Sequence, residues 1–141
     1  GGHCIPVDPW FLIYENEHET KLISQARKSN IMKETFVLNL LVTSLDELFE
    51  QNINVVFLGL AYKENVDDFR NSPAFNIYKQ LFTRFPKHVN AIDPLHRVET
   101  KMNINTISVE DAVNLQYNFI KLVNHDAFNE YKIPDNLMLE V

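Results

Sequence analysis

The chain has 141 residues, of which 45% are hydrophobic and 23% are charged, and its formal net charge is −6 at pH 7. This length suits about one domain with a core of its own, and a single cysteine excludes an internal disulfide framework. The acidic balance, without a lysine and arginine cluster, argues against a nucleic-acid partner, and no apolar run is long enough to span a membrane. We therefore expect a folded protein of a reducing, cytoplasmic compartment.

The first candidate site surrounds the single cysteine, Cys4, which follows two glycines and a histidine. Asp8 and Pro9 are typical of a helix N-cap followed by proline at the first helical position. A thiol just before a helix N-terminus lies near the positive end of the helix dipole, which favours the thiolate, whereas the Asp8 charge opposes it. Two interpretations remain: a nucleophilic thiol with Asp8 orienting a water or a substrate hydroxyl, or a buried structural cysteine.

Two helices are predicted next, over residues 9–28 and 31–51, because apolar residues recur there near helical spacing. A polar stretch at residues 15–20 weakens the first helix, and Ser29 and Asn30 are expected to cap or kink the chain between the two. The second helix is apolar on more than one face. It is therefore either an ordinary core helix or a helix at a domain junction or subunit interface.

From residue 52 onward the pattern changes to alternating strands and helices. Short apolar runs predict three buried strands, at residues 54–60, 89–94 and 117–123. Helices are predicted after them, over residues 73–82, 108–114 and 124–131. Ser72 is the expected N-cap of the first of these helices, with Pro73 at its first position. The order predicts a Rossmann-like parallel sheet with helices on both faces.

Ligands of open parallel sheets bind beyond the carboxyl ends of the strands, and polar residues follow all three predicted strands. Lys63 and Arg70 lie in the loop after the first strand, which ends at a helix start and so suits an anion, phosphate above all. The alternative is a solvated loop whose acidic and basic side chains pair with one another. Gly59 stands without the rest of a G-x-G-x-x-G fingerprint, so no dinucleotide-binding loop is predicted there. The other strand ends carry Asp93, His96, Asn124 and His125.

Two segments, taken together, resemble the UDP-glucose/GDP-mannose dehydrogenase family. The sequence GGHCIPVDPWF at residues 1–11 is similar to the catalytic-cysteine segment of that family. The sequence GLAYK at residues 59–63, with DDFRNSP at residues 67–73, resembles the first strand and loop of its C-terminal domain. The order and spacing agree, and the match spans nearly the whole chain. The cysteine segment is most similar to the branch that oxidises UDP-N-acetyl-mannosamine.

The resemblance implies an enzyme that oxidises the C6 alcohol of a UDP-sugar twice, with NAD, to a uronic acid. Cys4 would be the nucleophile that forms a thiohemiacetal and then a thioester, and Asp8 would activate water or handle the proton. Arg70 matches a residue that reaches the cofactor phosphates. Contacts with the substrate are implied for Gly2, His3 and Lys63. No metal site is predicted.

The resemblance also implies a division of the chain. Residues 1–51 would hold the catalytic-cysteine loop and a central helical segment, and residues 52–141 a truncated UDP-sugar-binding domain. The helix at 31–51 matches the one through which subunits of the family pair, so a homodimer is expected. The NAD-binding domain has no counterpart here, and we expect a C-terminal fragment, inactive alone, of an enzyme that supplies precursors of cell-surface polysaccharides. The alternative is a non-catalytic nucleotide-binding or dimerisation module.

Overall fold

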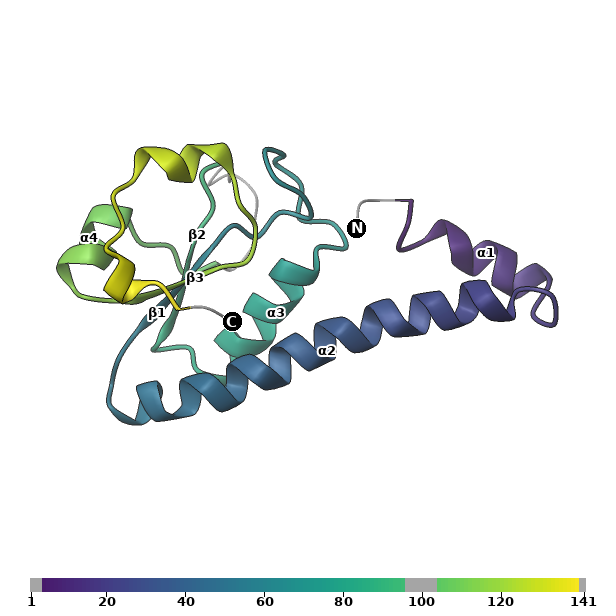
Figure 1. Cartoon of the computed structure of the whole chain (residues 1–141), viewed down its shortest axis with the longest axis horizontal. Coiled ribbons are helices and arrows are strands. Elements are labelled where there is room, and N and C mark those ends of the chain that lie inside the picture. Colours follow the sequence, from purple (N-terminus) through teal and green to yellow (C-terminus); the bar gives the residue numbers. More distant parts are fainter. Residues whose placement is uncertain (1–3, 96–103, 140–141) are drawn as a thin grey trace.

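The computed structural model describes residues 4–95 and 104–139. Figure 1 shows a long helix that runs along one side of a small α/β unit, with a short helix folded back over its far end. These two helices are α1 (Asp8–Glu15) and α2 (Lys21–Glu50). The strands are β1 (Val55–Leu58), β2 (Val89–Ile92) and β3 (Asn118–Lys121). The remaining elements are α3 (Pro73–Arg84), α4 (Val109–Asn114) and the 3₁₀ turns η1 (Asp126–Glu130) and η2 (Asp135–Leu137).

The helical segment differs from its prediction in one respect. The cap or kink expected at Ser29 and Asn30 is wrong, because α2 continues unbroken through both residues. Serine and asparagine cost only some tenths of a kcal/mol in a helix interior, about 0.7 at most, which packing elsewhere along the helix outweighs. The helices instead separate at residues 16–20, the predicted weak point, where Thr20 Oγ1 donates a hydrogen bond to the Asn16 carbonyl at 2.8 Å.

The three strands form a parallel sheet in the order β2-β1-β3. In the register, Val55 lies beside Val89 on one side and beside Asn118 on the other. Single parallel bridges extend the sheet outward on both edges, from Ala91 to Thr106 and from Phe119 to Met138.

Helices cover both faces of the sheet, because successive side chains of β1 point to opposite sides. Val55 and Phe57 belong to one core cluster, which α2 and α3 complete. Val56 and Leu58 belong to a second cluster, with residues from α4 and η1. The predicted Rossmann-like fold, a parallel sheet preceded by a long helical segment, is confirmed.

Burial is uneven along α2. Its buried residues are Leu41, Leu45 and Phe49, all in the part that packs on the sheet. None of the residues of α1 is buried. Large apolar side chains are exposed along both helices, namely Trp10, Phe11, Leu12, Tyr14, Leu22, Ile31, Met32, Phe36 and Leu40. Within the described ranges, no helix is both long enough and apolar enough to cross a membrane.

Candidate functional site

The loop that follows β1, residues 59–72, is called the β1 loop here, and a glycine fixes its start. Gly59 has φ = +79°, in the region that favours glycine, and a Cβ atom there would lie 2.3 Å from the Val123 carbonyl oxygen. The chain therefore leaves β1 in direct contact with the backbone that follows β3. Because β1 and β3 pair in parallel, their carboxyl ends and the polar residues beyond them lie at one edge of the sheet.

Asp93, which directly follows β2, holds the first residues of the β1 loop. Its Oδ2 atom accepts hydrogen bonds from the backbone N–H groups of Leu60 at 2.8 Å and Ala61 at 3.2 Å. Its Oδ1 atom accepts one from Leu95 N–H at 3.2 Å. Only 2% of the side chain is exposed. Because hydrogen bonds to an ionised carboxylate are among the stronger ones in proteins, Asp93 fixes this part of the loop firmly.

His125, which follows β3, is fully buried beside Asp93. Its Nδ1 atom accepts a hydrogen bond from Asn65 N–H at 3.0 Å. An accepting nitrogen carries no proton, so the imidazole proton is on Nε2. Nε2 lies 3.4 Å from Asp93 Oδ2, which is long for a hydrogen bond. The Phe128 ring packs edge-on against the imidazole, with centroids 5.7 Å apart. The sequence placed Asp93 and His125 at strand ends but gave no signal that they meet.

Asn65 also joins the β1 loop to the segment after β3 through its side chain. Its Nδ2 donates to Asp126 Oδ2 at 2.8 Å, and its Oδ1 accepts from Asp126 N–H at 2.9 Å. Asn65 has φ = +58°, a conformation that asparagine tolerates better than most residues. The predicted substrate residue Lys63 lies two residues before this double contact and is exposed.

Arg70, the predicted cofactor contact, pairs with a carboxylate of its own loop. Its Nε lies 3.0 Å from Asp68 Oδ1 and its Nη2 2.8 Å from Asp68 Oδ2, while 72% of the arginine side chain is exposed. The hydrogen bonds and the charge of Asp68 raise the pKa of Arg70 above its ordinary value. The β1 loop is thus partly self-paired, as one of the two interpretations anticipated, and the role of Arg70 toward a cofactor stays a prediction.

The predicted helix cap at the end of the β1 loop is confirmed. Ser72 Oγ accepts a hydrogen bond from Phe75 N–H at 3.2 Å, and Pro73 begins α3. The same hydroxyl donates to the Leu60 carbonyl at 2.7 Å. One buried side chain therefore ties the start of the loop to its end.

The cysteine segment is built more simply. The carbonyl of Cys4 accepts hydrogen bonds from Val7 N–H at 2.9 Å and Asp8 N–H at 2.8 Å. The predicted N-cap at Asp8 is wrong by one residue: α1 begins at Asp8, with Val7 before it and no side-chain cap, because a backbone carbonyl accepts the Asp8 N–H. Cys4 is exposed, so the interpretation as a buried structural cysteine is also wrong.

The substrate contacts expected at Gly2 and His3 lie outside the described residues, as does His96 at the end of β2.

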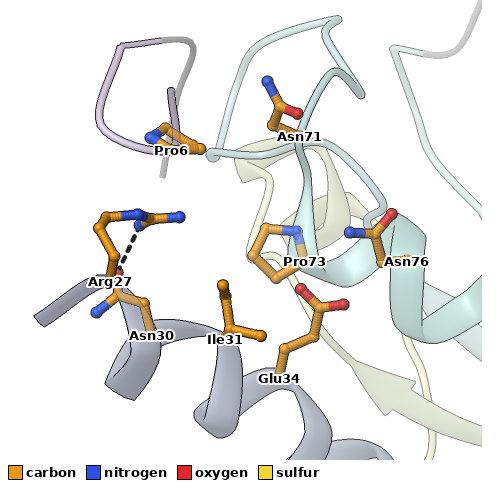
Figure 2. A pocket seen from close by; sticks show the side chains of 8 residues that line it. All are labelled: Pro6, Arg27, Asn30, Ile31, Glu34, Asn71, Pro73 and Asn76. Carbon is orange, nitrogen blue, oxygen red and sulfur yellow. Dashed lines mark hydrogen bonds between the residues drawn. The ribbon is translucent and has the colours of Figure 1, made fainter. Parts of the chain in front are cut away.

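A cleft of about 260 Å³ brings the cysteine segment and the β1 loop to one place. Figure 2 shows Pro6 and Asn71 on one side of it, while Arg27 extends from α2 toward Pro6 and Glu34 rises toward Pro73. The Arg27 guanidinium also donates to Asn30 Oδ1, at 3.2 Å. Sequence reasoning missed these residues of α2, because polar side chains on a long helix are most simply explained as a solvated face. The remaining lining residues are Asn30, Ile31 and Asn76.

Taken together, the fold and the site define a Rossmann-like α/β domain whose loops lie beyond the carboxyl ends of the strands, the edge at which ligands of open parallel sheets bind. Residues 56–138 match the family model described as "UDP-glucose/GDP-mannose dehydrogenase family, UDP binding domain". The chain belongs to this family, and the resemblance noted in its sequence is confirmed.

Curated relatives agree with this assignment. The chain is 33% identical over 135 residues to a UDP-N-acetyl-D-mannosamine dehydrogenase of Campylobacter jejuni, covering 92% of this chain and 33% of that protein. It is 28% identical over 137 residues to the protein of the same name from Escherichia coli (strain K12), covering 91% and 33%. The chain thus spans about a third of the length of these relatives.

Solved structures show the same fold. The UDP-D-ManNAc dehydrogenase from Pyrococcus horikoshii superimposes with a TM-score of 0.71 at 30% identity, over 94% of this chain and 30% of that one. The UDP-N-acetyl-mannosamine dehydrogenase Cap5O from S. aureus superimposes with a TM-score of 0.68 at 30% identity, over 98% and 32%.

Proposed function

We propose that this chain is the C-terminal part of an NAD-dependent nucleotide-sugar 6-dehydrogenase and that its α/β domain binds the UDP portion of the substrate. The family match over residues 56–138 supports UDP binding. Relatives named UDP-N-acetyl-D-mannosamine dehydrogenase match over nearly the whole chain, which favours UDP-N-acetyl-mannosamine as the sugar nucleotide. The enzyme would serve the synthesis of cell-surface polysaccharide precursors.

The observation that carries the proposal is the cleft between the cysteine segment and the β1 loop. Pro6, two residues after Cys4, and Asn71, near the end of the β1 loop, lie on one side of it, and Pro73 at the start of α3 also lines it. A substrate whose nucleotide contacts the β1 loop could therefore extend its sugar toward the cysteine segment. This arrangement suits a reaction in which one half of the chain binds and the other half reacts.

In the proposed reaction, Cys4 acts at C6 of the sugar. After the alcohol has been oxidised to the aldehyde, the sulfur would bond to C6 and give a thiohemiacetal, whose oxidation gives a thioester. Water would then cleave the thioester, releasing the uronic acid and the thiol. The backbone N–H of Asp8 is bonded to the Cys4 carbonyl, and its carboxylate is exposed. We assign this carboxylate to water activation or proton handling.

NAD would accept the hydride in both oxidations, and we propose that a part of the enzyme outside these residues holds most of it. Arg70 is the side chain here that suits the cofactor phosphates, because its guanidinium is exposed while Asp68 holds it in one orientation. The contact between Arg70 Nη2 and Asp68 leaves the positive charge of the guanidinium at the outer edge of the β1 loop.

Catalysis is tested in an enzyme that contains this chain. We expect Cys4→Ser to abolish formation of the uronic acid from UDP-N-acetyl-mannosamine and to leave at most the NADH of the first oxidation, because an alcohol is a far poorer nucleophile than a thiolate. Intact turnover in this variant, with UDP still bound, would favour the non-catalytic binding module. A panel of UDP-sugars tests the substrate, and oxidation of UDP-glucose with UDP-N-acetyl-mannosamine ignored contradicts our assignment.

UDP binding is tested by calorimetry on the 141-residue chain. We expect Lys63→Ala to weaken the Kd for UDP by about tenfold or more, equivalent to about 1.4 kcal/mol, because it removes an exposed cation from the ligand-facing edge. Lys79→Ala, which removes an exposed lysine from α3, is the matched control and should leave the Kd unchanged. Equal UDP binding by the wild type and Lys63→Ala contradicts the proposed site.

We also propose a homodimer through residues 31–51. Met32, Phe36 and Leu40 expose 66%, 59% and 40% of their surface on this part of α2, and a groove beside them continues to β3. A second copy would remove this apolar surface from water. Sedimentation should show that Phe36→Asp dissociates the dimer, whereas Leu22→Asp, at an exposed position outside the segment, does not. A dimer that survives Phe36→Asp contradicts this interface.

A further inference from the structure

The buried imidazole of His125 lies where three strand ends meet. It contacts Asn65 of the β1 loop through Nδ1 and faces Asp93, at the end of β2, through Nε2. It is 0% exposed, although no atom of it belongs to the candidate cleft. A buried polar ring is costly unless its nitrogens are satisfied, so its presence here requires a reason beyond filling the core.

The two nitrogens of His125 are not equally satisfied. The bond from Asn65 N–H to Nδ1 is 3.0 Å long, an ordinary hydrogen bond. Among the described residues Nε2 has no hydrogen-bond partner, since Asp93 Oδ2 is 3.4 Å away and already accepts two backbone N–H groups, those of Leu60 and Ala61. The strong contact of His125 is therefore the one to the β1 loop.

That contact acts on the segment that carries Lys63. Before Lys63, Leu60 and Ala61 are bonded to Asp93, and Tyr62 N–H is bonded to the Asp68 carbonyl at 3.0 Å. After it, Asn65 is bonded to His125 and, through its side chain, to Asp126. Lys63 and Glu64 thus lie between two tethered points, and the backbone of the lysine is held from both sides.

We propose that His125 and Asn65 are positioning residues for the nucleotide: their hydrogen bond, supported by Asp126, holds Lys63 in the conformation that meets the diphosphate of the UDP-sugar. The proposal rests on the role of Lys63 given above. Its physical basis is preorganisation, because a loop already ordered in the free protein loses less conformational entropy when it binds a ligand. The diphosphate is the relevant chemistry, since the positioned group is a cation.

Two substitutions of His125 separate the acceptor role of Nδ1 from the bulk of the side chain. His125→Asn places an amide oxygen near the position of Nδ1 and can still accept Asn65 N–H, whereas His125→Leu keeps similar bulk and accepts nothing. By calorimetry with UDP, we expect His125→Asn to bind within about threefold of wild type and His125→Leu to bind about tenfold or more weakly. His88→Leu removes a histidine bonded to Asn54 at the opposite edge of the sheet, and as the control it should bind UDP normally.

The combined variant with Lys63→Ala decides whether His125 acts through the lysine. If it does, His125→Leu weakens UDP binding in the wild type but adds nothing in the Lys63→Ala background. Equal and additive losses in both backgrounds would overturn the proposal. A folded His125→Leu with wild-type UDP affinity would also overturn it, while Lys63→Ala on its own still tests the UDP site separately.

Amide NMR tests the hydrogen bond between Asn65 and His125 itself, independently of UDP binding. The Asn65 amide should be protected from exchange in the wild type and in His125→Asn, and exposed in His125→Leu. If His125→Leu does not fold, Asp126→Ala replaces it, because this exposed residue supports Asn65 without entering the core. It should weaken UDP binding at an unchanged melting temperature, and a loss of affinity that appears only with a loss of stability would overturn the proposal.

Discussion

The two ends of α2 have similar apolar side chains in opposite environments. Toward its C-terminus, Leu41 and Leu45 are 0% and 1% exposed in the core against the sheet. Near its N-terminus Leu22 is 83% exposed, and near its middle Phe36 is 59% exposed. The difference teaches that helical periodicity marks which side chains can be buried, while burial itself depends on the element that packs against them.

The same contrast separates the two halves of the candidate site. The β1 loop is held by Asp93, Ser72 and His125, all buried side chains that follow or precede strands and helices of its own domain. The cysteine segment is held by backbone bonds to the Cys4 carbonyl and ends in a helix with no buried residue. The described part of the chain therefore holds the β1 loop through several buried side chains and leaves the proposed nucleophile exposed.

The largest expected effect in this comparison is at the start of the β1 loop. Gly59→Ala should destabilise the α/β domain by about 2–6 kcal/mol, because it adds a strained left-handed conformation to an overlap with the Val123 carbonyl. Urea unfolding followed by circular dichroism measures the change. Asn52→Gly, at an exposed left-handed position after α2, is the control and should have little effect. A Gly59→Ala variant as stable as wild type would mean that the loop start is not fixed.

The next effect compares the two ends of α2 directly. Leu41→Ala should cost about 2–5 kcal/mol through lost burial and a cavity, whereas Leu22→Ala should stay within about 0.5 kcal/mol. Thermal unfolding of both variants measures the difference, and the monomeric state should be used so that association does not contribute. Similar losses for the two leucines would show that the N-terminal part of α2 is covered after all.

A smaller effect compares two serine caps. Ser72→Ala should cost about 1–3 kcal/mol, because it removes the cap of α3 and leaves the Leu60 carbonyl without its donor. Ser108 caps α4 by accepting from Asp111 N–H but is exposed, so Ser108→Ala should cost about 1 kcal/mol. Chemical denaturation measures both values. If the exposed cap costs as much as the buried one, the loop contact of Ser72 contributes nothing.

The smallest effect concerns Tyr78 in α3, where burial raises the pKa above its ordinary value of 10.0. Its hydroxyl accepts a hydrogen bond from Asn105 N–H at 2.8 Å, so Tyr78→Phe should cost about 1–2 kcal/mol at pH 7. Above pH 10 the unfolded chain loses this proton while the folded protein keeps it, so wild-type stability falls as the pH rises.

The difference in the free energy of unfolding between wild type and Tyr78→Phe should therefore be smaller above pH 10 than at pH 7. Urea unfolding at the two pH values measures it. Tyr14→Phe is the control, since Tyr14 is 91% exposed and its substitution should leave the free energy of unfolding unchanged at both pH values. A gap that widens above pH 10 would contradict the direction of the Tyr78 pKa shift.

Local chemistry determined much of this protein from its sequence. Short apolar runs with Ser72 and Pro73 or Ser108 between them marked the strands and helices of the domain, since a cap needs only residues within one turn. The pairing of two motifs, around Cys4 and around Lys63, identified the family. The cap or kink placed at Ser29 and Asn30 failed because local propensity is weaker than the packing of a long helix.

Only the tertiary structure decided which of these residues meet. Asp93 and His125 lie 32 positions apart and could each have faced solvent, but the parallel order β2-β1-β3 places both beside the β1 loop. The cleft that Pro6 and Asn71 line together with residues of α2 likewise depends on how α2 packs. Sequence patterns encode contacts within a few residues, whereas contacts between distant segments follow from strand order and packing. For this reason the sequence alone supplied the residues proposed to react and to bind, and the fold decided how they are held.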